Sequence, residues 1–168
     1  YHDSAERSVS LGIAGSSAAG EFPKFLSLRE LAGQRTPHVL VKFSGVGESS
    51  QRWADLLVCE HLALSAARGL EGVEVARARG RASGGRTCLE SERVEGLGRF
   101  GRLPVVSLQA VSAHLLGLGA RDWREHARAL VEAGFLSRED AASIERLWWF
   151  GRLIANGDMH LGNCAFRV

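Results

Sequence analysis

Residues 147–163 have the sequence Leu147-Trp148-Trp149-Phe150-Gly151-Arg152-Leu153-Ile154-Ala155-Asn156-Gly157-Asp158-Met159-His160-Leu161-Gly162-Asn163. The apolar first half continues a helix that we expect to begin near Ser137, where Ser137 and Asp140 are spaced as in a capping box. The second half is polar and leads into a short β-like run at 164–166. The polar side chains of this loop are the most specific candidates for chemistry in the chain.

Asp158 and Asn163 are five residues apart in this loop, which is the spacing of the aspartate and asparagine in a kinase catalytic loop. In phosphoryl transfer the aspartate accepts the hydrogen of the attacking hydroxyl, and the asparagine gives an oxygen ligand to Mg²⁺. The alternative is a polar turn in which Asp158 caps a helix and Asn163 starts a strand. The loop by itself leaves both interpretations open.

Working outward from the loop, hydrophobic periodicity and turn residues predict a strand-rich half followed by a helical half. The expected strands are 25–28, 38–43, 73–81 and 87–93, and the expected helices are 52–68, 107–116, 122–134 and 137–155. Residues 1–95 would form a β-rich nucleotide-binding part, and 96–168 a helical part ending just after the catalytic loop. This is the two-lobe order of a protein kinase, so we expect an α+β fold of that type.

Lysine is rare in this chain: of 21 basic residues only Lys24 and Lys42 are lysines. Lys42 ends an apolar strand that precedes a helix containing Glu60, the arrangement in which a kinase lysine contacts the ATP phosphates and a helix glutamate holds it. Lys24 closes a loop with Gly15 and Gly20 that has no recognised phosphate-loop pattern, although it would allow close backbone approach. The alternative for Lys42 is a surface lysine with an unrelated glutamate. The alternative for the loop that ends at Lys24 is a flexible surface turn.

Composition excludes several broad classes of protein. The chain has 168 residues, 45% hydrophobic and 24% charged, which is ordinary for a globular domain and rules out wholesale disorder. It has no apolar run long enough for a membrane helix and no secretory signal at its start, so we expect no membrane association. The widely spaced Cys59, Cys88 and Cys164 predict buried free thiols and a cytoplasmic location.

Three other interpretations follow from scattered residues. The arginines of the expected hairpin could form a basic face for nucleic acid, although such residues usually mark a solvated side and the net charge is only +2; they are Arg77, Arg79, Arg81 and Arg86. Cys164 and His160 could form a nucleophile pair, but no third orienting group is apparent. The histidines lack partners at metal spacing, so we expect no zinc site, and we expect Trp148 and Trp149 in the core.

Taken together, these segments resemble the HipA family, the serine/threonine-protein kinase toxins of bacterial type II toxin–antitoxin systems, and in particular its YjjJ-type branch. The resemblance rests on Gly20-Glu21-Phe22-Pro23-Lys24-Phe25-Leu26, on Arg52-Trp53-Ala54-Asp55-Leu56-Leu57 and on residues 147–163. It implies an enzyme that uses ATP and Mg²⁺ to phosphorylate a serine or threonine of a protein substrate, with a HipB-like antitoxin as a possible partner. The loop and the Trp-Trp helix argue against a small-molecule kinase of the aminoglycoside type.

The resemblance also implies a role for individual residues. Asp158 would be the catalytic aspartate, Asn163 a magnesium ligand, and Lys42, positioned by Glu60, the phosphate-binding lysine. Ser17, or the adjacent Ser16, would be the autophosphorylated serine that switches the kinase off, because phosphate there would repel ATP. The remaining nucleotide contacts would come from the loop over the nucleotide, the hinge and the catalytic loop: Ala19, Gly20, Glu21, Phe22, Pro23, Lys24, Glu92, Arg93, Val94, His160 and Asn163.

This chain departs from the family pattern in the hinge and at its ends. The hinge, Glu92-Arg93-Val94-Glu95-Gly96, lacks the aromatic residue and final arginine of the family's Glu-Arg-Phe-Asp-Arg. A second metal-binding aspartate is expected roughly 20 residues past Asn163 in the family, beyond Val168, so we expect a fragment truncated at both ends. A non-catalytic remnant that binds nucleotide or an antitoxin, and a DNA-associated module, therefore remain as alternatives to an active kinase.

Overall fold

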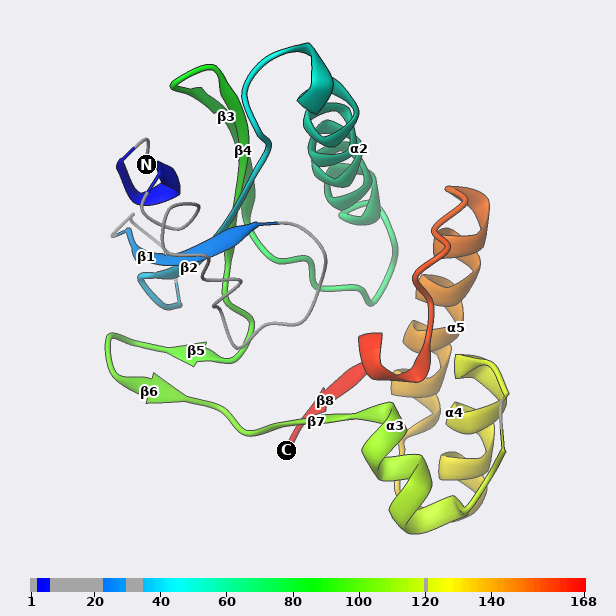
Figure 1. Ribbon diagram of the computed structural model, residues 1–168. Coiled ribbons are helices and arrows are strands. Elements are labelled where there is room, and N and C mark those ends of the chain that lie inside the picture. The colour runs from blue at the N-terminus through cyan, green and yellow to red at the C-terminus, as the bar shows by residue number, and fades with distance from the viewer. Residues whose placement is uncertain (1–2, 7–22, 30–34, 120) are drawn as a thin grey trace. The chain divides into compact units, whose positions relative to one another are not determined.

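The computed structural model describes residues 3–6, 23–29, 35–119 and 121–168, and it divides the chain into two compact units (Figure 1). The first unit comprises Tyr1–Ala66 and Val75–Arg102, and the second comprises Ala67–Glu74 and Leu103–Val168. Each contains both helix and strand, which confirms the α+β class. Among the described residues, no helix is long and apolar enough to span a membrane.

The first unit is built on a four-stranded antiparallel sheet with the strand order β1-β2-β4-β3. Its regular elements are β1 (Lys24–Leu28), β2 (His38–Phe43), the 3-10 turn η1 (Glu48–Ser50), α2 (Gln51–Ala67), β3 (Ala78–Ser83), β4 (Arg86–Glu92), β5 (Gly96–Leu97) and β6 (Gly101–Arg102). The predicted strand at 38–43 and helix at 52–68 are confirmed. The predicted strand at 73–81 is wrong in its first half, because regular pairing with β4 begins only at Ala78.

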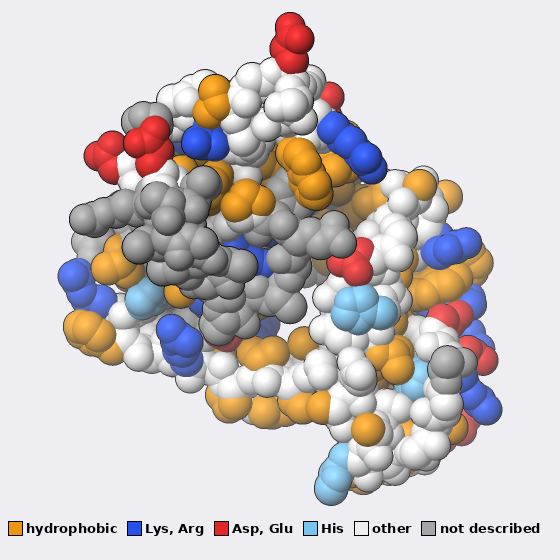
Figure 2. Space-filling model, in the orientation of Figure 1, with side chains coloured by type: hydrophobic (Ala, Val, Ile, Leu, Met, Phe, Trp, Pro, Cys, Tyr) orange, Lys and Arg blue, Asp and Glu red, His pale blue; other side chains and the backbone are white. Residues whose placement is uncertain are grey.

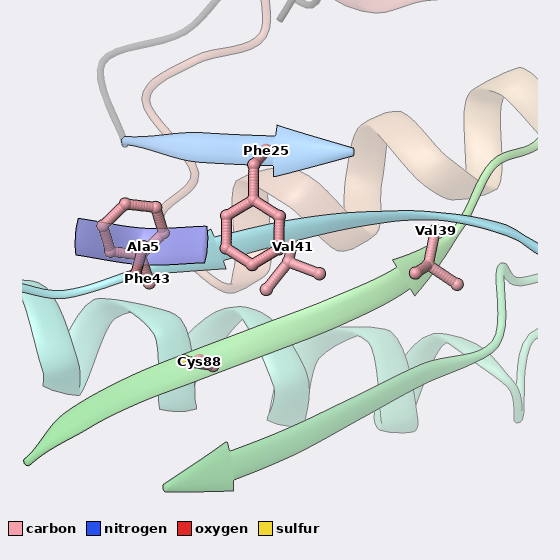
Figure 3. Close-up of a cluster of buried hydrophobic side chains, with 6 residues drawn as sticks. All are labelled: Ala5, Phe25, Val39, Val41, Phe43 and Cys88. Carbon is pink, nitrogen blue, oxygen red and sulfur yellow. The ribbon is translucent and has the colours of Figure 1, made fainter. Parts of the chain in front are cut away.

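The two faces of the sheet have different neighbours because side chains alternate along a strand. One face of the sheet contributes Phe25, Val39, Val41, Phe43 and Cys88 to a buried cluster that also holds Ala5 (Figure 3). Lys42 and Gly80 lie on the other face, where α2 packs: Lys42 is bonded to a residue of α2, and a Cβ added at Gly80 would lie 3.8 Å from the ring of His61. The alternation that buries Val41 and Phe43 therefore directs Lys42 toward α2.

A two-residue turn joins β3 to β4, as the glycine pair predicted. Gly84 and Gly85 have φ values of 56° and 71°, the left-handed conformation that both central residues of a type I′ turn require. The turn fixes the register of the hairpin, in which Arg79 lies opposite Glu90 and Gly80 opposite Leu89.

The second unit packs its helices around a separate core. Its elements are β7 (Val105–Ser107), α3 (Leu108–Val111), which continues as the π-helical turn η2 (Ser112–Leu116), α4 (Trp123–Glu132), α5 (Arg138–Leu153), the 3-10 turn η3 (Leu161–Asn163) and β8 (Ala165–Arg167). The buried cluster consists of Leu108, Trp123, Ala127, Leu130 and Ile144. α4 begins with a full capping box between Asp122 and Glu125, and Ser137 caps α5 through the backbone N–H of Asp140, as predicted.

The predicted buried side of α5 is only partly correct. Ile144 and Gly151 are buried, but Leu147 and Ile154 are exposed at 36% and 46%. α5 ends at Leu153 and Ala155 adopts a left-handed conformation, so Ile154 no longer follows the helical stripe. The expectation of a tryptophan pair in the core is wrong for Trp149, which is 48% exposed.

A substitution of Gly96 tests the packing of the segment after β4. A Cβ at Gly96 would lie 2.6 Å from Oγ1 and 2.7 Å from Cβ of Thr36, a buried residue whose hydroxyl donates to the carbonyl of Gly98 at 2.9 Å. We expect Gly96→Ala to lower the free energy of unfolding by about 1–3 kcal/mol, the usual cost of overpacking, as measured by urea denaturation. Gly119→Ala, whose Cβ would meet nothing within 4 Å, is the control; equal stability of both variants would contradict the packing described.

Candidate functional site

An ion pair between Lys42 and Glu60 joins β2 to α2 in the first unit. The Nζ atom of Lys42 donates to both carboxylate oxygens of Glu60, at 2.7 and 2.9 Å. The two side chains are 28% and 34% exposed, so both are partly buried. The structure thus brings together the lysine and the glutamate that we expected to pair, although they are 18 residues apart in the sequence.

The chain's only other lysine lies beside this pair. Lys24 of β1 is the register partner of Lys42 on β2, and directly opposed residues of antiparallel strands share one face of the sheet. Partial burial and the charge of Lys42 lower the pKa of Lys24 below its ordinary value. Two cationic side chains in opposed positions repel each other, and an anion bound near them would relieve that repulsion.

The hinge segment after β4 is tied to the segment before β2. The carboxylate of Glu92 accepts hydrogen bonds from the backbone N–H groups of Arg35 and Thr36, at 2.9 and 3.3 Å, and the guanidinium of Arg35 donates to the carbonyl of Val94. Arg93 donates its backbone N–H to His38 O and forms an ion pair with Glu95. The side chain of Glu92 therefore links the hinge to the backbone of Arg35 and Thr36. Adenine binding by this hinge stays a prediction.

Of the predicted nucleotide loop, the structure describes Pro23 and Lys24. Pro23 is exposed and leads directly into β1, which begins at Lys24. The other predicted residues lie outside the described part of the structure, and their roles stay predictions; they are Ser16, Ser17, Ala19, Gly20, Glu21 and Phe22.

In the second unit, the predicted catalytic residues lie together in one loop. The side-chain amide of Asn163 donates to the carbonyl of Asp158 at 2.9 Å, and the backbone N–H of Asp158 donates to Oδ1 of Asn156 at 3.0 Å. Since the Asn163 nitrogen is used inside the loop, its Oδ1 is the atom left to serve as an acceptor or metal ligand. The carboxylate of Asp158 is 77% exposed and so is accessible to a substrate.

His160 is oriented toward Asp158 by a backbone contact. Its Nδ1 accepts a hydrogen bond from the N–H of Gly162 at 3.0 Å, so the neutral ring carries its proton on Nε2. Nε2 lies 3.5 Å from Oδ1 of Asp158. Because a Cβ at Gly162 would lie 2.9 Å from Nδ1 of His160, glycine permits this close approach.

Three further residues that the sequence did not assign to the site hold this loop in place. The indole N–H of Trp123, on α4, donates to the carbonyl of His160 at 3.0 Å, and Met159 packs against Gly151, where a Cβ would lie 2.7 Å from the methionine Cε. The signal for Trp123 was its position on the apolar stripe of α4, because a buried indole N–H needs an acceptor. Nothing in the sequence pattern identified Met159 or its contact with Gly151.

The alternative of a nucleophile pair formed by Cys164 and His160 loses support in this structure. Burial raises the pKa of the Cys164 thiol to about 11, so at neutral pH it is protonated and a poor nucleophile. All three cysteines are free, as expected, but only Cys88 is fully buried: Cys164 is partly buried, and Cys59 is exposed on α2. In the described residues no group of three or more His, Cys, Asp or Glu side chains forms a metal cluster.

The candidate residues thus fall into two groups, one in each unit. Comparison with known proteins shows that the chain is similar to Toxin YjjJ of Escherichia coli (strain K12). The two are 38% identical over 170 residues, and the alignment covers 99% of this chain but 38% of that toxin. The chain is therefore a homologue of part of Toxin YjjJ. No family model and no solved structure matches it.

The helix end before the catalytic loop allows a stability test. Asn156 N–H donates to Gly151 O at 2.9 Å and Ala155 N–H to Arg152 O at 3.2 Å, the bonds of a Schellman motif, yet Ala155 has a φ of 55°. We expect Ala155→Gly to raise the free energy of unfolding by about 0.5–1 kcal/mol, because the relieved strain, about 1–2 kcal/mol, exceeds the extra entropy that glycine loses.

Urea denaturation of Ala155→Gly beside Ala142→Gly provides the measurement and its control. Ala142 lies inside α5 without a left-handed backbone, so glycine there should lower stability by about 1 kcal/mol. If both variants were destabilised to the same extent, the proposed strain at Ala155 would be refuted.

Proposed function

We propose that this chain is the core of an ATP- and Mg²⁺-dependent serine/threonine protein kinase that acts as a toxin. The homology to Toxin YjjJ supports the toxin assignment. The bidentate ion pair between Lys42 and Glu60, at 2.7 and 2.9 Å, is the observation that carries the kinase assignment, because a strand lysine held by a helix glutamate is the pair that positions ATP phosphates in protein kinases.

In this proposal the first unit binds the nucleotide. Lys42 contacts the phosphates while Glu60 keeps its ammonium group in place, and the neighbouring Lys24 adds a second positive charge. The phosphates in turn compensate the repulsion between the two lysines. Residues 19–23 would cover the nucleotide, and the backbone of 92–94 would bind the adenine.

The second unit supplies the groups that act on the acceptor hydroxyl. Asp158 accepts the proton of the serine or threonine hydroxyl. As the proton leaves, the hydroxyl oxygen forms a bond to the γ-phosphorus, and the bond between that phosphorus and the leaving ADP oxygen breaks. Asn163 Oδ1 is an oxygen donor of the kind that Mg²⁺ prefers. Mg²⁺, when bound, neutralises charge that develops on the phosphates. The nearby His160 side chain completes this polar loop and would contact the nucleotide.

Regulation and partners follow from the same proposal. Phosphate on Ser17, or on Ser16, would place about two negative charges next to the phosphate-binding loop and oppose ATP binding. The natural acceptor would be a serine or threonine of another protein in the cytoplasm, and a HipB-like antitoxin would be the partner that restrains the activity. Nucleotide binding without transfer would instead indicate a non-catalytic remnant.

Replacement of Lys42 tests nucleotide binding. We expect Lys42→Ala to weaken the affinity for Mg²⁺-ATP by at least about tenfold, because a charged hydrogen bond contributes about 1.5–3 kcal/mol; titration calorimetry provides the measurement. Glu60 is partly solvent-exposed, so its loss of a partner should not prevent folding. Arg52→Gln, an exposed basic residue of α2, is the charge-matched control, and unchanged affinity of Lys42→Ala would remove Lys42 from the site.

Replacement of Asp158 separates transfer from binding. We expect Asp158→Asn to bind Mg²⁺-ATP with an affinity close to that of the unmodified chain but to lose phosphate transfer to serine by about 10²–10⁴-fold, as followed by mass spectrometry of phosphoserine at positions 16 and 17 and in a mixed protein substrate. Glu139→Gln, an exposed acid of α5, should transfer normally. Transfer by Asp158→Asn at the unmodified rate would refute its role as the base.

A further inference from the structure

Strand β3 forms one edge of the sheet and carries an unusual set of charges. The strand order β1-β2-β4-β3 leaves β3 paired to β4 alone (Figure 1). Arg79 and Arg81 on this strand, and Arg77 just before it, are exposed. Within the described residues, none of the three guanidinium groups has a hydrogen-bond or ion-pair partner. The nearest acid in the register, Glu90 opposite Arg79, is bonded to Arg29 at 2.6 Å.

The register shows which backbone groups of β3 point away from the sheet. Glu92 N–H donates to Arg77 O, so residues 77 and 92 form a hydrogen-bonded pair. Hydrogen-bonded and non-hydrogen-bonded pairs alternate along an antiparallel hairpin, so Arg79 and Arg81 also belong to hydrogen-bonded pairs. Ala78, Gly80 and Ala82 occupy the intervening positions, and their N–H and C=O groups therefore point outward from the edge. No bond to these outward groups occurs in the described part of the chain.

The same alternation places small side chains where the backbone faces outward and arginines where it does not. Ala78, Gly80 and Ala82 lie on the face toward α2, and the three arginines lie on the opposite face at intervals of about 6.8 Å, the distance between alternate residues of a strand. An added strand would have its own alternate side chains at the same interval. We propose that β3 is a docking edge for an extended acidic segment of a partner protein, which adds to the sheet as a further strand.

Charge complementarity decides the occupant. A second copy of this chain pairing edge to edge through β3 would bring like-charged arginines of both copies onto one face, where cross-strand repulsion is destabilising. A nucleic acid could contact the guanidinium groups through its phosphates but would leave the outward N–H and C=O groups unused. Only a polypeptide with acidic residues at alternate positions satisfies both the backbone edge and the arginines. This inference does not depend on phosphotransfer by the chain.

Proline at position 80 tests strand addition without changing the charge. The N–H of Gly80 points outward, so Gly80→Pro keeps the hydrogen bonds between β3 and β4, and proline is tolerated at such edge positions. Gly80 has no left-handed φ, and its Cβ would lie 3.8 Å from His61, an ordinary contact. The probe is a fluorescein-labelled peptide of alternating glutamate and valine, followed by fluorescence anisotropy with the whole 168-residue chain.

We expect the peptide to bind and its affinity to fall at least about tenfold both in Gly80→Pro and in the double variant Arg79→Gln, Arg81→Gln, while Arg52→Gln on α2 binds normally. Amide exchange at Ala78, Gly80 and Ala82 should slow when the peptide is bound. If Gly80→Pro fails to fold, amide exchange provides the test. The peptide should slow exchange at these three amides in the unmodified chain and should not slow it in the double variant.

Three outcomes would overturn the proposal. The first is no binding of the acidic peptide to the folded chain, which would leave the arginines as a guard against edge-to-edge aggregation. The second is binding unaffected by Gly80→Pro. The third is a duplex DNA probe that binds more tightly than the peptide, loses affinity steeply with salt and in the arginine variant, and is insensitive to Gly80→Pro, which would assign the arginines to nucleic acid.

Discussion

The ion pair between Lys42 and Glu60 is the contact on which the proposed site of the first unit depends. A partly buried ammonium group is tolerated because a carboxylate from α2 accepts two of its hydrogens, and the pair in turn fixes which part of α2 faces β2. The core side chains on the other face of β2 determine that Lys42 points to α2 at all. The first unit also exposes hydrophobic side chains, among them Leu26, Val46 and Leu62. Hydrophobic groups, coloured orange, are visible on the molecular surface in Figure 2.

The loop of the second unit combines a fixed backbone with accessible side chains. Its carbonyl groups are the anchored atoms: His160 O accepts from Trp123 and from the backbone of Asn163, and Asp158 O accepts from the Asn163 amide. The carboxylate of Asp158 remains largely exposed. In the proposed kinase, such a loop would present its base to a substrate without reorganising, which favours transfer.

Strong local patterns made much of this predictable from sequence. The apolar alternation of 38–43, the Gly84-Gly85 turn and the cap at Ser137 each specify a local structure that the fold retains. The lysine–glutamate pair was predictable because a strand lysine followed by a helix glutamate is the arrangement of a kinase small lobe. The support from Trp123 and Met159, the exposure of Trp149 and the anchoring role of Glu92 depend on tertiary packing, which periodicity does not encode.

The central proposal is that Lys42, held by Glu60, binds the phosphates of ATP. Titration of Mg²⁺-ATP into the isotopically labelled chain, followed by amide NMR shifts, tests it most directly. We expect amides around Lys42 and Glu60 to shift and to saturate with ATP, and these shifts to be lost in Lys42→Ala. No shift around Lys42 in a chain shown to be folded, or shifts that persist in Lys42→Ala, would contradict the proposal.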